Sequence, residues 1–348
     1  MTGKTSLFTI LTGVHQETRI GSTAVRTGVT KVPDPRLDEL AKIFDPPKIT
    51  SASVEYADMP SISKESLRDP SYLATLRVVD AFAHVLRFFK DESVPHEQGS
   101  VDPLRDLEDV EMELILSDLV VVEKRLERLD KDRKKIKSPE LDHEFELLQK
   151  CKTQLEANIP LRTMTMDADE EKRVRGFQFL SQKPMLFVLN LDESDVGNMQ
   201  AREEEFRKTT LANRPGTEAS AICGKVEAEL AELPAEEAAE YLASYGLKES
   251  GLVRLISATY RLQGLMSFLT AGETEVRAWT VPIGSTAQKA AGAIHSDFEK
   301  KFIRAEVVNW KNLVDLKGYP GVREKGLLRL EGKEYIVKDG DVLVIRHG

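Results

Sequence analysis

The chain has 348 residues, of which 41% are hydrophobic and 31% charged. This composition predicts a globular protein of two or three domains and excludes a mainly disordered chain. The formal net charge of −9 argues against attraction of the whole surface to nucleic acid, and we expect no sequence-specific DNA binding, although a local basic patch can still contact RNA. We find neither an apolar run of about 18 residues nor a secretory leader, so we expect a cytoplasmic protein without a membrane span.

Residues 1–13 read MTGKTSLFTILTG, a loop that runs into an apolar helical pattern. Gly3, Lys4 and Thr5 match the end of the phosphate-binding motif G-x-x-x-x-G-K-[ST], in which Lys pairs with the β- and γ-phosphates and Ser or Thr binds Mg²⁺. The first Gly and the preceding strand would lie before residue 1. We therefore expect that the chain is truncated within this loop, by a misassigned start or a real deletion. The alternative is an ordinary N-terminal helix.

Short apolar runs at 53–56 and 185–189 predict strands, and a polar residue follows each of them. Polar residues at strand ends suit an α/β nucleotide site. Asp58 lies where a second strand would direct a carboxylate towards Mg²⁺ through water, although a turn Asp is the simpler interpretation. Asn190 follows the other strand.

The string Asn190-Leu191-Asp192-Glu193 is similar to the base-reading Asn-Lys-x-Asp of GTPases, with Leu for Lys and Glu for Asp. A longer acid and the loss of Lys should weaken the selection of guanine. Cys223-Gly224-Lys225 precedes a helical stretch and occupies the place of the loop that closes over the base. Cys223 and Cys151 are far apart, so we expect reduced thiols rather than a disulfide or zinc site.

Two long helices interrupt this α/β pattern. Residues 102–135 are charged and rich in Leu at helical spacing, and a second helical pattern follows Ser138-Pro139. The short turn between them predicts an antiparallel helical hairpin. Strand-like sequence resumes only after Pro184.

A third pattern begins near residue 271 and predicts a small α+β module. It contains strands at 276–281 and 341–346, a hairpin turn at 331–333 and a helix over 286–298. Residues 271–348 hold 13 Lys and Arg against 11 Asp and Glu, whereas the rest of the chain carries −11. This module is therefore the more favourable contact with RNA.

The order of these motifs resembles the Obg-like ATPase family of the YchF type. The strings that carry the resemblance span the whole chain: GKTSLF (3–8), VPDPRLDELAKIF (32–44), GSVDPLRDLE (99–108), ELILSDL (113–119), NLDE (190–193), KVEAELAEL (225–233), EVRAWTVPIGSTAQKAAGAIHSDFEKKFIRAEV (275–307) and LEGKEYIVKDGDVLVIR (330–346).

The resemblance implies an α/β fold: a P-loop, GTPase-like domain with an inserted helical hairpin, followed by a TGS domain of β-grasp form. The expected boundaries are 1–101 and 166–270 for the two parts of the nucleotide-binding domain, 102–165 for the helical insertion and 271–348 for the TGS domain. It also implies an Mg²⁺-dependent ATPase that associates with ribosomes or ribosomal RNA through the TGS domain and the helical arm.

The site residues drawn from the motifs and from the family fall into three groups. The phosphate and metal group comprises Gly3, Lys4, Thr5, Ser6 and Asp58; the adenine group comprises Asn190, Leu191, Glu193, Cys223 and Gly224. The third group positions water: the family has a hydrophobic residue in place of the usual Gln, which Ile62 fits, and a His that corresponds to His96. An imidazole can orient or polarise water; the alternative is an ordinary surface-loop His.

The sequence departs from the family at two places that bear on γ-phosphate sensing. The Asp58 motif ends in Ser61 after Pro60, where the family has Gly, and the first switch leaves Ser22 or Thr23 as its candidate hydroxyl. A non-hydrolysing nucleotide- or ribosome-binding adaptor therefore remains an alternative to an ATPase, and so does a GTPase of the same fold.

Overall fold

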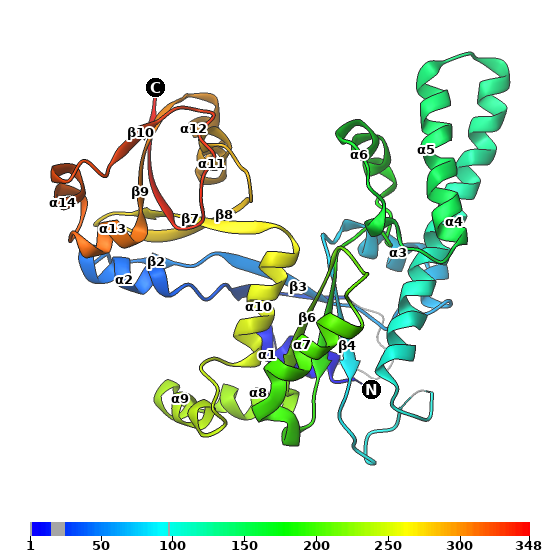
Figure 1. Cartoon of the computed structure of the whole chain (residues 1–348), viewed down its shortest axis with the longest axis horizontal. Coiled ribbons are helices and arrows are strands. Elements are labelled where there is room, and N and C mark those ends of the chain that lie inside the picture. The colour runs from blue at the N-terminus through cyan, green and yellow to red at the C-terminus, as the bar shows by residue number, and fades with distance from the viewer. Residues whose placement is uncertain (1, 15–24, 97) are drawn as a thin grey trace. The chain divides into compact units, whose positions relative to one another are not determined.

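The structure is a computed structural model that describes residues 2–14, 25–96 and 98–348. It divides into two compact units, each formed by two separate stretches of chain (Figure 1). The first unit contains Met1–Arg26 and Ala57–Leu255, and the second contains Thr27–Tyr56 and Ile256–Gly348. Strands β1 (Arg26–Lys31) and β3 (Ser53–Asp58) pair in a two-stranded sheet.

The first unit is built around a three-stranded parallel sheet with the order β4–β5–β6. Its main elements are α1 (Lys4–Thr12), α3 (Pro70–Val78), β4 (Phe82–Arg87), α4 (Pro103–Lys135), α5 (Pro139–Glu156), α6 (Ala168–Val174), β5 (Met185–Asn190), α7 (Met199–Thr209), β6 (Thr217–Ile222), α8 (Gly224–Glu232), α9 (Ala235–Ser244) and the start of α10 (Gly251–Leu262).

Strand β5 is the centre of this sheet, and all six of its residues are buried. Its continuous apolar sequence suits a parallel strand that is covered on both faces. Side chains from β4, β5, β6, α3 and α7 form one hydrophobic core around it. This core fixes the strand ends at which the predicted site residues lie.

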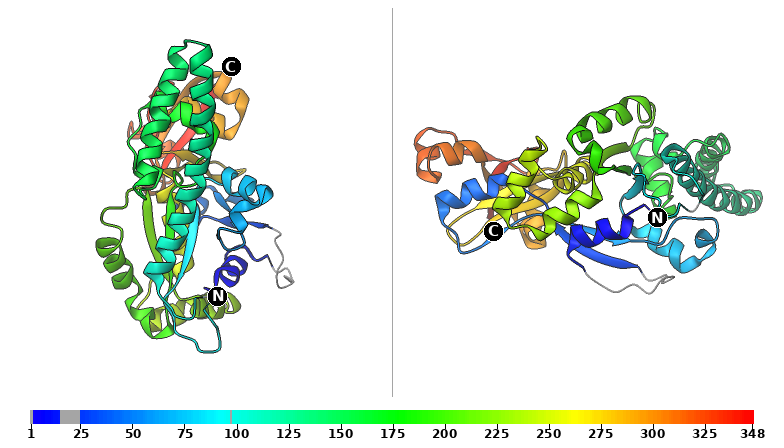
Figure 2. Two further views of the ribbon diagram at one scale, coloured as in Figure 1. Left: turned by 90° about the vertical axis from the view of Figure 1, so that its right-hand side faces the viewer. Right: turned by 90° about the horizontal axis from the view of Figure 1, so that it is seen from below.

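Helices α4 and α5 lie side by side in all three views (Figures 1 and 2). Both begin with Pro at the first helical position, as predicted for α5, and the Asp102 side chain accepts a hydrogen bond from the Arg105 backbone N–H at 3.1 Å. Their apolar stripes share a second core that includes Val122, Leu129 and Leu148. The pair follows β4 and precedes β5 in the chain.

The second unit contains a six-stranded sheet with the order β10–β9–β11–β7–β8–β2. Its elements are α2 (Pro35–Phe44), β2 (Ile49–Thr50), β7 (Leu265–Ala271), β8 (Val276–Pro282), α11 (Ala287–Ile294), α12 (Ser296–Lys300), β9 (Phe302–Asn309), α13 (Trp310–Asp315), α14 (Tyr319–Glu324), β10 (Arg329–Glu331) and β11 (Asp341–His347).

Three details of the second unit differ from the prediction. The turn at Gly332 does not join two paired strands, because β10 and β11 lie on opposite sides of β9. The helix expected over 286–298 is two helices separated at His295, whose side chain caps the second by accepting from the Asp297 N–H. The predicted boundary at 271 lies within the unit, since β7 begins at Leu265 and residues 27–56 also belong to it.

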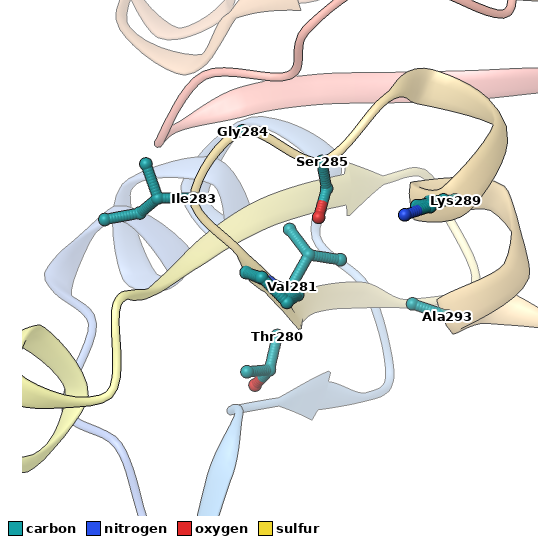
Figure 3. Close-up of a pocket in the computed structure, with 8 residues that line it drawn as sticks. Thr280, Val281, Ile283, Gly284, Ser285, Lys289 and Ala293 are labelled. Atoms are coloured by element: carbon teal, nitrogen blue, oxygen red, sulfur yellow. The ribbon is translucent and has the colours of Figure 1, made fainter. Parts of the chain in front are cut away.

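A shallow pocket lies between β8 and α11 of the second unit (Figure 3). The loop from Ile283 to Ser285 forms its rim, and Lys289 extends over it from α11. The predicted nucleotide-binding residues belong to the first unit and do not line this pocket. Within the described part of the chain, no helix combines the length and the apolar character that a membrane span requires.

Candidate nucleotide-binding site

The Gly3-Lys4-Thr5 triplet forms the start of helix α1, and three of its contacts lead to the end of β3. Gly3 has a φ of 88°, a conformation that favours glycine, and it is the residue before the first helical turn. The Lys4 ammonium donates to the Asp58 carboxylate and to the Met59 carbonyl. The Thr5 hydroxyl donates to the other Asp58 oxygen at 3.1 Å. The structure thus brings together the Lys, the Thr and the Asp that the sequence separates by more than fifty residues.

Asp58 is buried, and three side chains hold its carboxylate. Besides Lys4 and Thr5, the Arg26 guanidinium donates to it from the start of β1 while it stacks over the Phe8 ring. Burial pushes the pKa of Asp58 upwards, but the hydrogen bonds from Lys4, Arg26 and Thr5 outweigh burial and hold this pKa below its ordinary value. The side chain is therefore a carboxylate near neutral pH.

The Thr5 hydroxyl and the Asp58 carboxylate form a donor set of the kind that Mg²⁺ prefers, since this hard cation takes oxygen ligands and retains several waters. Thr5 and Ser6 are both exposed at the first turn of α1. They are thus open to a ligand. Two oxygen atoms from the protein, with the remainder from phosphate and water, suit this ion.

Asn190 links the phosphate-side segment to the predicted base loop. Its amide nitrogen donates to the Thr2 carbonyl, and its amide oxygen accepts from the Gly224 N–H, each at 2.9 Å. A Cβ atom added at Gly3 would lie 2.6 Å from that amide nitrogen. Glycine at this position therefore allows the Asn190 side chain to lie close to the backbone, in addition to the positive φ. Asn190 therefore joins the backbone before α1 to the start of α8.

The other residues of the NLDE string point in different directions. Leu191 is only 3% exposed and packs into the core of the first unit, so its side chain does not face a ligand. Asp192 caps the following 3₁₀ helix (Glu193–Asn198) by accepting from the Ser194 N–H at 3.1 Å. Glu193 instead forms an ion pair with Lys225.

The predicted base loop continues into helix α8. Cys223 is buried directly before this helix. The buried Glu227 carboxylate on α8 accepts from the Gly251 N–H at 2.7 Å, at the start of α10. Burial raises the pKa of Glu227. Its hydrogen bonds from backbone N–H groups lower this pKa and offset part of the effect of burial. The base loop is thus followed by a helix that is anchored to the start of α10.

His96 lies in the loop between β4 and α4 and is held by both ring nitrogens. Its Nε2 lies 2.9 Å from an Asp106 carboxylate oxygen, and its Nδ1 accepts from the Gln98 N–H at 3.2 Å. Within the described ranges, no hydrogen bond joins this ring to Lys4 or Asp58. The structure therefore places His96 against the start of α4.

The structure describes one of the two departures from the family pattern. Ser61 is exposed, and the neighbouring Ile62, which fits the pattern, packs against the core of the first unit. Ser22 and Thr23, the candidate switch hydroxyls, lie outside the described residues.

Sequence reasoning missed Arg26 and the role of Lys225. A lone Arg at the start of a strand carries no motif, and its contact with Asp58 depends on the pairing of β1 with β3. For Lys225 there was a signal, because it occupies the same position after β6 that Glu193 occupies after β5.

Comparisons with known proteins agree on one family. A family model described as YchF-GTPase_C, protein of unknown function (DUF933), matches residues 265–348. Relatives named Ribosome-binding ATPase YchF include that of Bacillus subtilis, 39% identical over 99% of this chain and 96% of the relative. That of Escherichia coli O157:H7 is 38% identical over 98% and 95%.

A solved structure, that of the Schizosaccharomyces pombe YchF GTPase, aligns with a TM-score of 0.84 and 28% identity over 99% of this chain and 95% of that chain. This alignment supports a mixed α/β fold of the YchF type, with sequence and structure in agreement along nearly the whole length. The chain therefore belongs to the YchF family.

Proposed function

We propose that the protein is an Mg²⁺-dependent ATPase that prefers ATP to GTP and acts as a ribosome-associated switch. The observation that carries this proposal is the junction of Lys4 and Thr5 with the Asp58 carboxylate at the start of α1. Together they provide one cationic group and several oxygen atoms at a single site, which suits a metal-bound triphosphate. The relatives named as ribosome-binding ATPases support the same reading.

On the phosphate side, each polar group has a separate task. The Lys4 ammonium would pair with the β- and γ-phosphates, the Ser6 hydroxyl would approach the α-phosphate, and Gly3 would allow the backbone to lie close to them. Thr5 and Asp58 would hold Mg²⁺, which neutralises phosphate charge during transfer. Arg26 would keep the Asp58 carboxylate in place when Lys4 turns towards a nucleotide.

On the base side, Asn190 fixes the loop while Glu193 supplies a carboxylate. Cys223 and Gly224 lead the chain over the base, and Leu191 supports this edge from the core rather than by touching the ligand. A guanine site uses the short carboxylate of Asp, and it rejects adenine because its polar groups would stay unpaired. Glu in place of that Asp relaxes this selection and so favours adenine.

His96 is the proposed water-positioning residue. Both ring nitrogens are engaged in the structure, Nε2 by the Asp106 carboxylate and Nδ1 by the Gln98 N–H. To reach water at a γ-phosphate the ring would have to leave Asp106, so hydrolysis should be slow without a partner that releases it.

The ribosomal contact is assigned to two parts of the chain. We propose that the second unit includes a TGS domain of β-grasp form and that α4 and α5 form an arm that contacts the ribosome or its RNA. The six-stranded sheet and the paired helices support these assignments. Ser22 or Thr23 would sense the γ-phosphate, and a ribosomal partner places the action in the cytoplasm.

The experiment that tests the proposed function measures phosphate release from saturating ATP and GTP by the full chain. The assay is run with Mg²⁺ and with a chelator, with and without purified ribosomes. We expect turnover of ATP above that of GTP, loss of turnover with the chelator, and co-sedimentation with ribosomes. Binding without turnover would favour the adaptor instead, and preferred turnover of GTP would favour a GTPase.

For His96→Ala we expect ATP turnover to fall by about 100-fold or more while ATP affinity stays close to that of the unmodified protein, because general acid–base groups act mainly in the transition state. His143→Ala is the matched control, since His143 is an exposed histidine on α5 of the same unit. Turnover and the dissociation constant are measured on both variants. Equal losses of binding and turnover would assign His96 a structural role.

A further inference from the structure

The shallow pocket between β8 and α11 is bordered by residues whose backbone is firmly held. The Ser285 N–H donates to the Pro282 carbonyl at 3.1 Å, and the Ser285 carbonyl accepts from the Val337 N–H at 3.0 Å. Lys289 lies in the first turn of α11, where its N–H donates to the Thr286 hydroxyl oxygen at 3.3 Å. The backbone thus fixes the positions from which both side chains extend.

Two polar side chains reach this pocket without a partner. Ser285 is only 7% exposed, and its hydroxyl makes no hydrogen bond to any residue that the structure describes. Within the same residues the exposed Lys289 ammonium forms neither a hydrogen bond nor an ion pair. Figure 3 shows the Ser285 oxygen pointing into the space above Val281, with the Lys289 nitrogen turned towards it. Since buried polar groups usually have a partner, this hydroxyl indicates a place for a ligand atom.

The backbone at the start of α11 does not supply further donors. The Ala287 N–H donates to the Tyr335 carbonyl at 2.7 Å, and the Gln288 N–H donates to the Lys333 carbonyl at 3.4 Å. The next N–H of the helix is the one held by Thr286. A ligand in this pocket would therefore be held by the ammonium and the hydroxyl rather than by the helix terminus.

The lining selects the charge and the shape of the ligand. Lys289 is its charged residue, and apolar surface comes from Val281, Pro282, Ile283 and Ala293. The cavity has a volume of about 310 Å³, which is at the lower end for a ligand pocket. One ammonium with one hydroxyl suits a carboxylate, because Lys is a point charge and lacks the planar fork with which Arg holds a phosphate on two oxygens.

We propose that this pocket binds the C-terminal end of a partner polypeptide whose last side chain is short and apolar. The Lys289 ammonium and the Ser285 hydroxyl donate to the terminal carboxylate. The last side chain lies against Val281 and Ala293. A chain end carries both groups on one carbon atom, and a shallow pocket covers only that end while the preceding residues stay in solvent. Capture of a terminal carboxylate is a recurring mode of peptide recognition.

The test uses NMR titration of the isotopically labelled full chain with a short glycine–serine peptide that ends in valine. The amide signals of Gly284 and Ser285 report on the pocket. We expect them to shift with the free-acid peptide and not with the same peptide amidated at its C-terminus. Lys289→Met should weaken binding by about tenfold or more and Ser285→Ala by about three- to tenfold, the losses of a charged and of a neutral hydrogen bond.

Lys325→Met is the matched control, since Lys325 is an exposed lysine after α14 of the same unit, and it should leave the affinity unchanged. Equal binding of the amidated peptide, or an equal loss in the control, would overturn the role of the carboxylate pair. Isovalerate that binds as tightly as the peptide would overturn the polypeptide partner in favour of a free acid. Absence of any shift at millimolar peptide would overturn the site. These measurements contain no nucleotide, so their outcome is independent of the proposed ATPase.

Discussion

Lys4→Ala is expected to abolish ATP hydrolysis and to weaken ATP binding by about 10- to 100-fold, the effect of losing a charge-assisted hydrogen bond of about 1.5–3 kcal/mol. The ammonium is the positive charge at the start of α1, where it contacts Asp58 and the Met59 carbonyl. Without it the β- and γ-phosphates lose their pairing group, and their charge is not neutralised in the transition state.

The fold should survive this substitution, because Arg26 and Thr5 still hold the Asp58 carboxylate. Lys4→Gln keeps a polar side chain and removes the charge, so it separates charge from packing. Lys64→Ala removes an exposed lysine six residues after Asp58 and serves as the control. Turnover and ATP affinity equal to those of the control in both Lys4 variants would remove this loop from the nucleotide site.

Glu111→Ala is expected to lower the free energy of unfolding by about 3–5 kcal/mol, the cost of leaving a buried charge without its partner. Glu111 on α4 pairs with Arg162 and with Arg214, and the Glu111 and Arg162 side chains are 5% and 3% exposed. Burial, together with the nearby Arg214, lowers the pKa of Arg162 to about 10. Removal of the carboxylate leaves two like charges close together.

Urea denaturation of the variants measures this effect. Glu204→Ala, which removes an exposed acid on α7, should cost less than about 1 kcal/mol. The double substitution Glu111→Leu with Arg162→Met should recover most of the loss, since apolar replacement of a buried pair is often neutral. A loss below about 1 kcal/mol in Glu111→Ala would show that water reaches this cluster.

The elements with strong local patterns were predictable from the sequence. The apolar run of β5 and the leucine spacing of α4 are local patterns, each of which predicts its element without information from distant residues. The predicted limits differ from those in the structure by one residue each. Lys4, Thr5 and Asp58 were assigned to one site from their motifs, and the structure brings them together.

What depends on distant pairing was not predictable. The two-residue strand β2 pairs in parallel with β8, more than two hundred residues later, and nothing in Ile49-Thr50 specifies that partner. The Gly332 turn has hairpin chemistry, yet the strands next to it bind to opposite edges of β9. Similarly, Leu191 stands in a base-reading string although its side chain completes the core.

The division of both units into separate chain segments affects the order in which they fold during synthesis. Residues 27–56 leave the ribosome long before their partners, since 57–255 are made before the chain reaches Ile256. At about 5–20 residues per second, this wait lasts on the order of 10–40 s. During that time α2 and β2 lack the sheet against which they pack, so this segment cannot complete its unit until β7 and β8 have been made.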